Sequence, residues 1–232
     1  MPVIGVRFLF FEEEPGLSRR EARLTVAEEI ANSLTHGLGL GLGIAALVFL
    51  VLTAARHGTA ISVTSAAIYG ATLVILYAAS TLYHALPKGR AKTVFGVLDH
   101  CAIFLLIAGT YTPFTLVGLR GGWGWSLFGV IWSLAVVGIV AEAVTAGRAR
   151  RLQVMLYLAM GWMAVIAIGP MFSSLSAGAL WFLFGGGVAY SLGVIFYRWH
   201  SLKYHHAVWH VFVLAGSALH VVAVMVFILP AG

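Results

Sequence analysis

The sequence predicts an all-α integral membrane protein: a bundle of seven transmembrane helices with its N-terminus in the cytosol and its C-terminus outside. Of the 232 residues, 61% are hydrophobic and only 9% are charged, which is too little polar surface for a soluble globular chain of this length. Seven windows are long and apolar enough to cross a bilayer. The Lys and Arg residues collect in alternate connections between these windows, as they do in multi-pass proteins.

A transmembrane helix needs about 20 mostly apolar residues. The windows that meet this requirement are roughly residues 30–54, 60–86, 94–118, 123–146, 152–171, 177–198 and 205–230. Residues 1–28 lack the pattern of a secretory signal and carry several charges, so we expect them to remain as a cytosolic leader. Residues 29–232 then form the seven-transmembrane domain.

The distribution of the 14 Lys and Arg residues sets the expected orientation. Four lie in the leader, three in the second connection, three in the fourth and two in the sixth, whereas only Arg56 and Arg120 fall on the other side. Basic residues of short connections stay in the cytosol, so the leader side is predicted to be cytosolic. The net charge of +6 follows from this topology, and nucleic acid is not an expected partner. We expect a multi-pass protein of the bacterial inner (plasma) membrane.

This orientation places polar residues from several spans at one depth, near the inner leaflet. Ser80 and His84 lie at the cytosolic end of the second span, Asp99 in the first turns of the third, and His206 and His210 at the start of the seventh. Residues four apart share a helix face. Ionisable side chains are costly inside a membrane, so their gathering at one depth indicates a functional site.

Three imidazoles and a carboxylate at one point match the donors of a zinc site with an open coordination position. Zn²⁺ is therefore the expected cofactor, with His84, His206 and His210 as ligands. Asp99 is either a fourth ligand or, as we favour, the general base that takes a proton from water. Ser80 hydrogen-bonds the water or a substrate carbonyl oxygen, or alternatively its own helix backbone. A metal-free cluster that joins the helices by hydrogen bonds is the competing interpretation.

Further polar residues are given supporting roles. Glu29, Asn32 and His36 form a stripe on the first span and are expected to orient the ligands, or alternatively to cap the span or pack, rather than to bind the metal. His220 lies ten residues beyond His210, about 15 Å deeper in the membrane, which is too far to share a metal. We expect His220 and His100 to be satisfied hydrogen-bonding residues.

Four short segments carry these polar residues: EEIANSLTHG at 28–37, STLYH at 80–84, LDH at 98–100 and HAVWH at 206–210. They resemble the motifs of the hemolysin III family, within the progestin and adipoQ receptor (PAQR) superfamily, which is itself similar to the alkaline ceramidases. The resemblance implies seven helices, a cytosolic N-terminus and a zinc site facing the inner leaflet, with the three histidines as ligands and Asp99 and Ser80 beside them. It also implies hydrolysis of lipid amide or ester bonds, the activity attributed to better understood members of the superfamily. The substrate of the hemolysin III branch stays open.

Three hypotheses about function follow from the sequence. The leading one is a membrane zinc hydrolase that acts on a lipid amide or ester bond near the inner leaflet, so that a membrane lipid is its substrate. The second is a sensor or regulator of membrane lipid state that is stabilised by zinc and has no turnover. A zinc ion bound by four protein ligands would favour this hypothesis, because structural zinc sites are usually closed in this way. The third, an ion or proton pathway through Asp99 and Glu142, is weaker because the outer half of the spans has few ionisable residues.

Overall fold

The computed structural model describes residues 24–231, which are helical and contain no strand. Seven segments of this part of the chain are long and apolar enough to cross a membrane: Val26–Arg56, Ala60–Ala85, Arg90–Leu119, Gly121–Thr145, Arg150–Ser174, Ala177–Arg198 and His205–Ala231. Each coincides with one predicted span, so the prediction of an all-α, seven-span membrane bundle is confirmed. Most of the expected leader, residues 1–23, lies outside the described residues.

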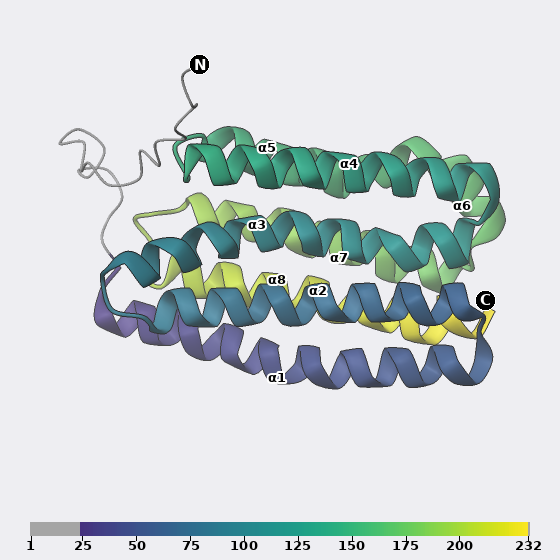
Figure 1. Ribbon diagram of the computed structural model, residues 1–232, viewed down its shortest axis with the longest axis horizontal. Helices are drawn as coiled ribbons and strands as arrows, with labels where there is room; N and C mark the ends of the chain where they lie inside the picture. Colours follow the sequence, from purple (N-terminus) through teal and green to yellow (C-terminus); the bar gives the residue numbers. More distant parts are fainter. Residues whose placement is uncertain (1–23, 232) are drawn as a thin grey trace, which may run out of the picture.

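Eight α-helices and four short segments of other helix types build the seven spans within residues 24–231. In chain order they are α1 (Val26–His57), α2 (Ala60–Ala85), α3 (Arg90–Pro113), η1 (Phe114–Leu119), α4 (Gly121–Thr145), α5 (Arg150–Gly161), η2 (Trp162–Ala167), α6 (Ile168–Ser174), α7 (Ala177–Arg198), α8 (His205–Ala223), η3 (Val224–Ile228) and η4 (Leu229–Ala231). The spans lie side by side along the long axis of the molecule (Figure 1). α1 packs against α2 and α8, α2 against α3, α3 against α4, and α7 against α8.

Two prolines explain why the third and fifth spans are not regular α-helices throughout. Pro113 ends α3, and the π-helical η1 follows it directly. Pro170 lies in α6, directly after the 3₁₀ segment η2. Proline has no N–H to donate and its ring clashes with the carbonyl group four residues earlier, so the regular bonding pattern breaks on its N-terminal side or shifts beyond it.

Tyr111 compensates for the break in the fifth span. Its hydroxyl group donates to the carbonyl oxygens of Met160 (3.0 Å) and Gly161 (2.9 Å) and accepts from the backbone N–H of Ala164 (2.8 Å). Backbone groups inside a membrane must find partners within the protein. A single side chain of α3 thus replaces helical hydrogen bonds that are lost where α5 passes into η2.

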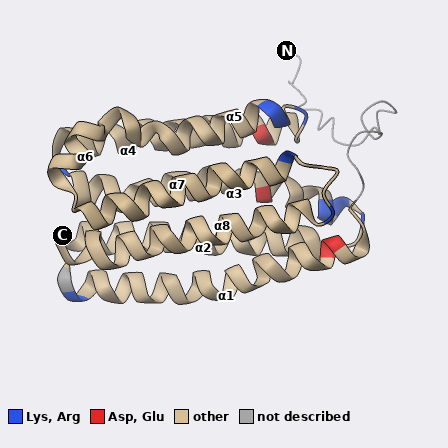
Figure 2. Ribbon diagram, turned by 180° about the vertical axis from the view of Figure 1, so that it is seen from behind, with Lys and Arg blue, Asp and Glu red and all other residues tan. Residues whose placement is uncertain are grey.

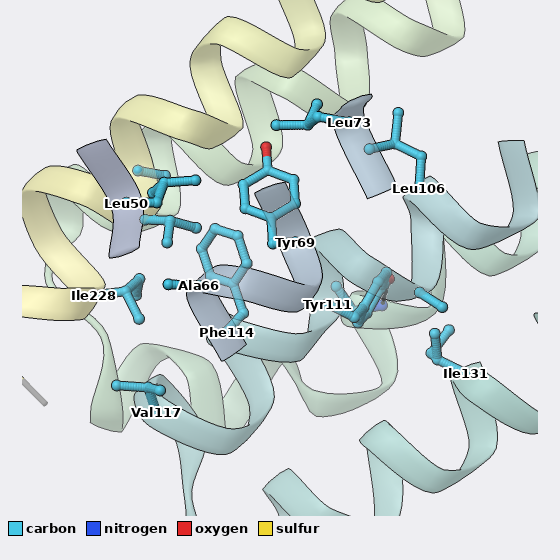
Figure 3. Packing of buried hydrophobic residues seen from close by; sticks show 14 of the residues in the cluster. Leu50, Ala66, Tyr69, Leu73, Leu106, Tyr111, Phe114, Val117, Ile131 and Ile228 are labelled. Atoms are coloured by element: carbon cyan, nitrogen blue, oxygen red, sulfur yellow. Dashed lines mark hydrogen bonds between the residues drawn. The ribbon is translucent and has the colours of Figure 1, made fainter. Parts of the chain in front are cut away.

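The core lies where α1, α2, α3 and the last span meet. Figure 3 shows Leu50, Tyr69, Phe114 and Ile228 packed together, and all four are 2% exposed or less. Many other large apolar side chains remain on the outer surface, for example Trp181, which is 79% exposed. An apolar exterior is expected of a bundle whose solvent is lipid.

Charged residues gather at one end of the bundle, where α1, α3, α5 and α8 begin and α2, α4 and α7 end (Figure 2). We call this the basic end. The opposite end of the described chain carries two basic residues, Arg56 and Arg120. All five predicted metal-site and catalytic residues lie on the helix segments nearest the basic end.

Candidate metal centre

His84, His206 and His210 come together at the basic end. One potential ligand atom of each ring lies within 4.8 Å of those of the other two. His84 belongs to the last turn of α2, and the other two share a face in the first turns of α8. The ring centroids are 5.0 Å apart for His84 and His206, 5.1 Å for His84 and His210, and 4.6 Å for His206 and His210. The structure therefore brings together the three residues that the sequence singles out as metal ligands.

Glu29 of α1 fixes the orientation of the His84 ring. His84 Nδ1 lies 2.6 Å from Glu29 Oε2 and donates its proton to this carboxylate oxygen. The other carboxylate oxygen of Glu29 lies 3.0 Å from Lys92 Nζ. His84 Nε2 is buried and has no hydrogen-bond partner within the described part of the chain. The proton is held on Nδ1, so Nε2 keeps its lone pair for a metal.

α1 orients the His210 ring in the same way. His210 Nδ1 lies 3.2 Å from the backbone carbonyl oxygen of Asn32 and 3.1 Å from Thr35 Oγ1. The ring of His36 stacks on the ring of His210, with centroids 3.4 Å apart and planes 13° from parallel. Asn32 Nδ2 also approaches His84 Nδ1, at 3.4 Å. Glu29, Asn32 and His36 thus contact the ligand rings directly from α1, by hydrogen bonds or by stacking.

Asp99 and Ser80 flank the three histidines without joining their cluster of ligand atoms. Asp99, on α3, is only 7% exposed. Ser80 is fully buried on α2, and among the described residues its hydroxyl group makes no hydrogen bond, so the alternative of a bond to its own helix backbone is not realised. The hydroxyl group is nevertheless close enough to interact electrostatically with the Asp99 carboxyl group.

The site opens into an internal cavity of about 150 Å³. Ser80, Asp99, His206 and His210 line one part of it, and Phe114 and His220 line another. Most of the remaining lining consists of apolar side chains from α3, α5, α7 and α8. Such a cavity suits the hydrocarbon part of a ligand and presents few polar groups for its recognition.

Glu28 ties the start of α1 to the start of α8, a link that the sequence analysis missed. Glu28 completes a capping box with Thr25, and its Oε1 atom accepts a hydrogen bond of 3.1 Å from the backbone N–H of Tyr204. Tyr204 adopts a left-handed conformation (φ 58°) immediately before α8. The capping pattern is visible in the sequence, but the contact with a residue so distant along the chain is not.

A second polar network lies beside the cavity, between α3, α4, α5 and α7. Glu142 is fully buried and accepts hydrogen bonds from His100 Nδ1 (3.2 Å) and from Gln153. His100 Nε2 lies 2.6 Å from Arg150 Nη1, which also contacts the hydroxyl group of Tyr197 at 3.1 Å. His100 therefore has partners for both ring nitrogens, as expected. His220 differs from the expectation, because only one of its nitrogens has a partner among the described residues.

Comparison with known proteins places this geometry in a family. The model of the haemolysin-III related family matches residues 24–221. Hemolysin-3 of Bacillus cereus is 43% identical over 216 residues, covering 92% of this chain and 99% of that protein. The Hemolysin-3 homolog of Bacillus subtilis (strain 168) is 47% identical over 194 residues, covering 84% and 91%.

A human protein is also similar to this chain over nearly its whole length, at lower identity. The monocyte to macrophage differentiation factor of Homo sapiens is 27% identical over 224 residues, covering 94% of this chain and 92% of that protein. The match spans nearly the whole membrane bundle, including the helices that carry the three histidines. The chain belongs to the hemolysin III family, within the PAQR superfamily of seven-helix membrane proteins.

Proposed function

We propose that this protein is a zinc-dependent hydrolase that cleaves an amide or ester bond of a membrane lipid. The observation that carries the proposal is the convergence of three imidazole ligand atoms within 4.8 Å, beside a buried carboxylate and a buried hydroxyl group. Two of the three rings, those of His206 and His210, line the wall of an apolar cavity. Catalytic zinc sites combine three protein ligands with one open position.

The donor set suits zinc. Imidazole is a preferred zinc ligand, and a ligating ring normally donates its second N–H to a carboxylate or a carbonyl group. His84 does so to Glu29, and His210 does so to Asn32. The buried, unpartnered Nε2 of His84 is costly in a membrane unless something binds it. A zinc ion held here would supply Lewis-acid activation of water and of the substrate carbonyl group.

Asp99 and Ser80 supply the remaining chemistry. The Asp99 carboxylate is positioned as the general base that receives a proton from the attacking water. The hydroxyl group of Ser80, which makes no hydrogen bond within the described residues, is free to donate to the carbonyl oxygen as negative charge develops there. Burial of both side chains excludes bulk water and strengthens these interactions.

The substrate class follows from the surroundings of the site. The apolar lining of the cavity accepts a hydrocarbon chain, and the histidines at its wall meet the polar bond that is cut. The excess of Lys and Arg at the basic end favours a cytosolic position for that end. The scissile bond would then lie near the inner leaflet of the bacterial plasma membrane.

Metal analysis combined with a lipid assay tests the proposal. The purified protein should contain about one zinc per chain, and His206→Ala and His210→Ala should lose it. His200→Ala is the matched control, because His200 is an exposed histidine at the same end of the bundle and should not affect zinc content. Asp99→Asn should keep zinc and lower fatty-acid release by about 10²–10⁴-fold.

Two results would contradict the proposal in different ways. Wild-type protein that binds no zinc would remove the metal site and the chemistry with it. Zinc-loaded protein that releases nothing from a broad panel of lipid amides and esters would remove the hydrolase and favour the sensor hypothesis.

A further inference from the structure

The side chain of His220 lines the same cavity, far from the metal centre. It lies ten residues beyond His210 on α8, which corresponds to about 15 Å along a helix. Its Nε2 atom lies 2.9 Å from the backbone carbonyl oxygen of Leu183. A carbonyl oxygen only accepts, so Nε2 carries the proton. A charged ring is expensive at this depth in a membrane, so the ring is neutral and Nδ1 is an acceptor.

This acceptor is held in place and has no partner within the described part of the chain. The side chain is 7% exposed, and its Nδ1 atom is buried. The ring fits against Gly186 of α7, where an added Cβ would lie 2.3 Å from the imidazole. The rings of Phe114 and Tyr190 flank it, with centroids 6.3 Å and 5.6 Å away. A buried acceptor without a donor costs about 1–3 kcal/mol, so a ligand that supplies a donor gains affinity here.

The neighbouring hydroxyl groups are already engaged with one another. The hydroxyl groups of Tyr77 and Tyr190 each lie 2.8 Å from Ser217 Oγ. Thr110 Oγ1, also on the cavity wall, donates to the carbonyl oxygen of Leu106 at 2.8 Å. The ligand that fits this part of the cavity is therefore mostly apolar and carries a hydrogen-bond donor of its own.

We infer that His220 Nδ1 accepts a hydrogen bond from a hydroxyl group on the hydrocarbon chain of the lipid, and so selects hydroxylated chains. The inference rests on the proposed function, which places the carboxyl end of that chain at the metal centre. A hydroxyl group fits better than an amide, because an amide adds a carbonyl oxygen, and the nearby hydroxyl groups of Tyr190 and Thr110 are already paired. The distance between the two ends of the cavity fixes which position along the chain is read.

Binding of fatty acids to the full chain in nanodiscs, loaded with zinc, tests the inference. The probes are saturated fatty acids of one length that carry no hydroxyl group or a single hydroxyl group at successive positions. The expected result is an affinity maximum at one hydroxyl position, with binding roughly two- to tenfold tighter than that of the unsubstituted acid. The ring nitrogen NMR signal of His220 should shift with that ligand and not with the unsubstituted acid.

Variants assign the preference to His220. His220→Phe should abolish it, whereas His220→Gln should keep part of it, because the amide can donate to Leu183 and still offer an oxygen acceptor. His205→Phe is the matched control: His205 Nδ1 also bonds a backbone carbonyl group of α7, that of Phe196 at 3.2 Å, but His205 does not line the cavity. If His220→Phe does not fold, the Gln variant and the wild-type NMR shift decide the question.

The outcomes separate this inference from the proposed function. Equal affinity for every probe, or a preference that persists in His220→Phe, overturns the role of His220. Because binding is measured without turnover, a protein that shows the preference but hydrolyses no lipid keeps this inference and loses the proposed function. A protein that is an active zinc hydrolase but shows no preference for a hydroxyl position keeps the proposed function and loses this inference.

Discussion

At the scale of single residues, the contacts that α1 makes with His84 and His210 decide which nitrogen each ring presents. Glu29 and the carbonyl group of Asn32 both bind the Nδ1 side, so these contacts leave the Nε2 atom of each ring as the one that can bind a metal. A histidine without such a partner samples two tautomers and several ring orientations, which weakens metal binding. These two contacts therefore preorganise the cluster before any metal arrives.

Glu29→Gln is expected to weaken zinc binding by up to about 10–100-fold, the usual effect of losing the partner of a ligating histidine. The neutral amide accepts a weaker hydrogen bond from His84 Nδ1 than the carboxylate does and no longer pairs with Lys92. Competition with a chromophoric chelator measures the change. Glu142→Gln is the control, because Glu142 is a buried carboxylate that bonds His100 and should leave zinc affinity unchanged. Equal zinc affinity in Glu29→Gln and wild type would contradict the assigned role of Glu29.

Sequence reasoning reached the three histidines because helix periodicity and depth in the membrane are both readable from the chain. It could not show that Lys92 pairs with Glu29, or that Glu28 binds the backbone of Tyr204, because such contacts depend on how α1 is rotated against its neighbours. His220 illustrates the same limit. Its burial is predictable from the sequence, but the lack of a partner for Nδ1 depends on the side chains that α3 and α7 place around it.

At the scale of the helices, the fifth span changes helix type in its middle. Tyr111 stabilises this break by hydrogen-bonding to the backbone there. The sequence contains Pro170, which forbids a continuous α-helix, but it does not say which neighbour replaces the missing hydrogen bonds. The replacement comes from α3, whose side chains also line the cavity. The same helix, α3, thus hydrogen-bonds to the backbone at the break and lines the cavity.

Tyr111→Phe should lower the free energy of unfolding by about 1–3 kcal/mol, because it removes the hydrogen bonds that the hydroxyl group makes to buried backbone groups of Met160, Gly161 and Ala164. Thermal unfolding in detergent measures the loss. Tyr157→Phe is the matched control: its hydroxyl group bonds the carbonyl oxygen of His100, which lies inside a regular helix, so a smaller loss is expected. Similar losses in the two variants would contradict the special role of Tyr111.

The contact between α1 and α2 depends on Gly70. A Cβ atom at this position would lie 2.7 Å from the Cα atom of Leu47, so Gly70→Ala must push the two helices apart. A destabilisation of about 1–3 kcal/mol is expected, as for other overpacked sites. At Gly41, also on α1, an added Cβ meets no atom within 4 Å, and Gly41→Ala should be neutral or stabilise the protein by up to about 1 kcal/mol. Equal melting temperatures for both variants would show that this helix contact is not tightly packed.

At the scale of the whole molecule, the sequence predicts the number of spans, their order and nearly their bounds. The reason is that membrane thickness imposes a length and hydrophobicity that few other constraints produce. The arrangement of the spans around one another was not predictable in the same way, because the exterior and the interior of the bundle are both apolar. Only the polar residues distinguish an inward face, and the charged ones among them are concentrated at the basic end.

The same charge distribution predicts that the basic end faces the cytosol. In a Cys101→Ala background, Lys88→Cys should react with a membrane-impermeant maleimide only after the inner face is exposed. Gly122→Cys should react in intact spheroplasts. Both positions are exposed, and they lie at opposite ends of the bundle. Labelling of Lys88→Cys in intact spheroplasts would place the candidate metal centre at the outer leaflet instead.

The histidine cluster joins the second span to the last one. During synthesis, His84 enters the bilayer long before the ribosome has made the two histidines of α8. A nascent chain that stopped after α7 could insert six spans and still lack two of the three imidazoles. Acquisition of metal would therefore be a late event in biogenesis, and a prematurely terminated chain would be released into the membrane without the capacity for it.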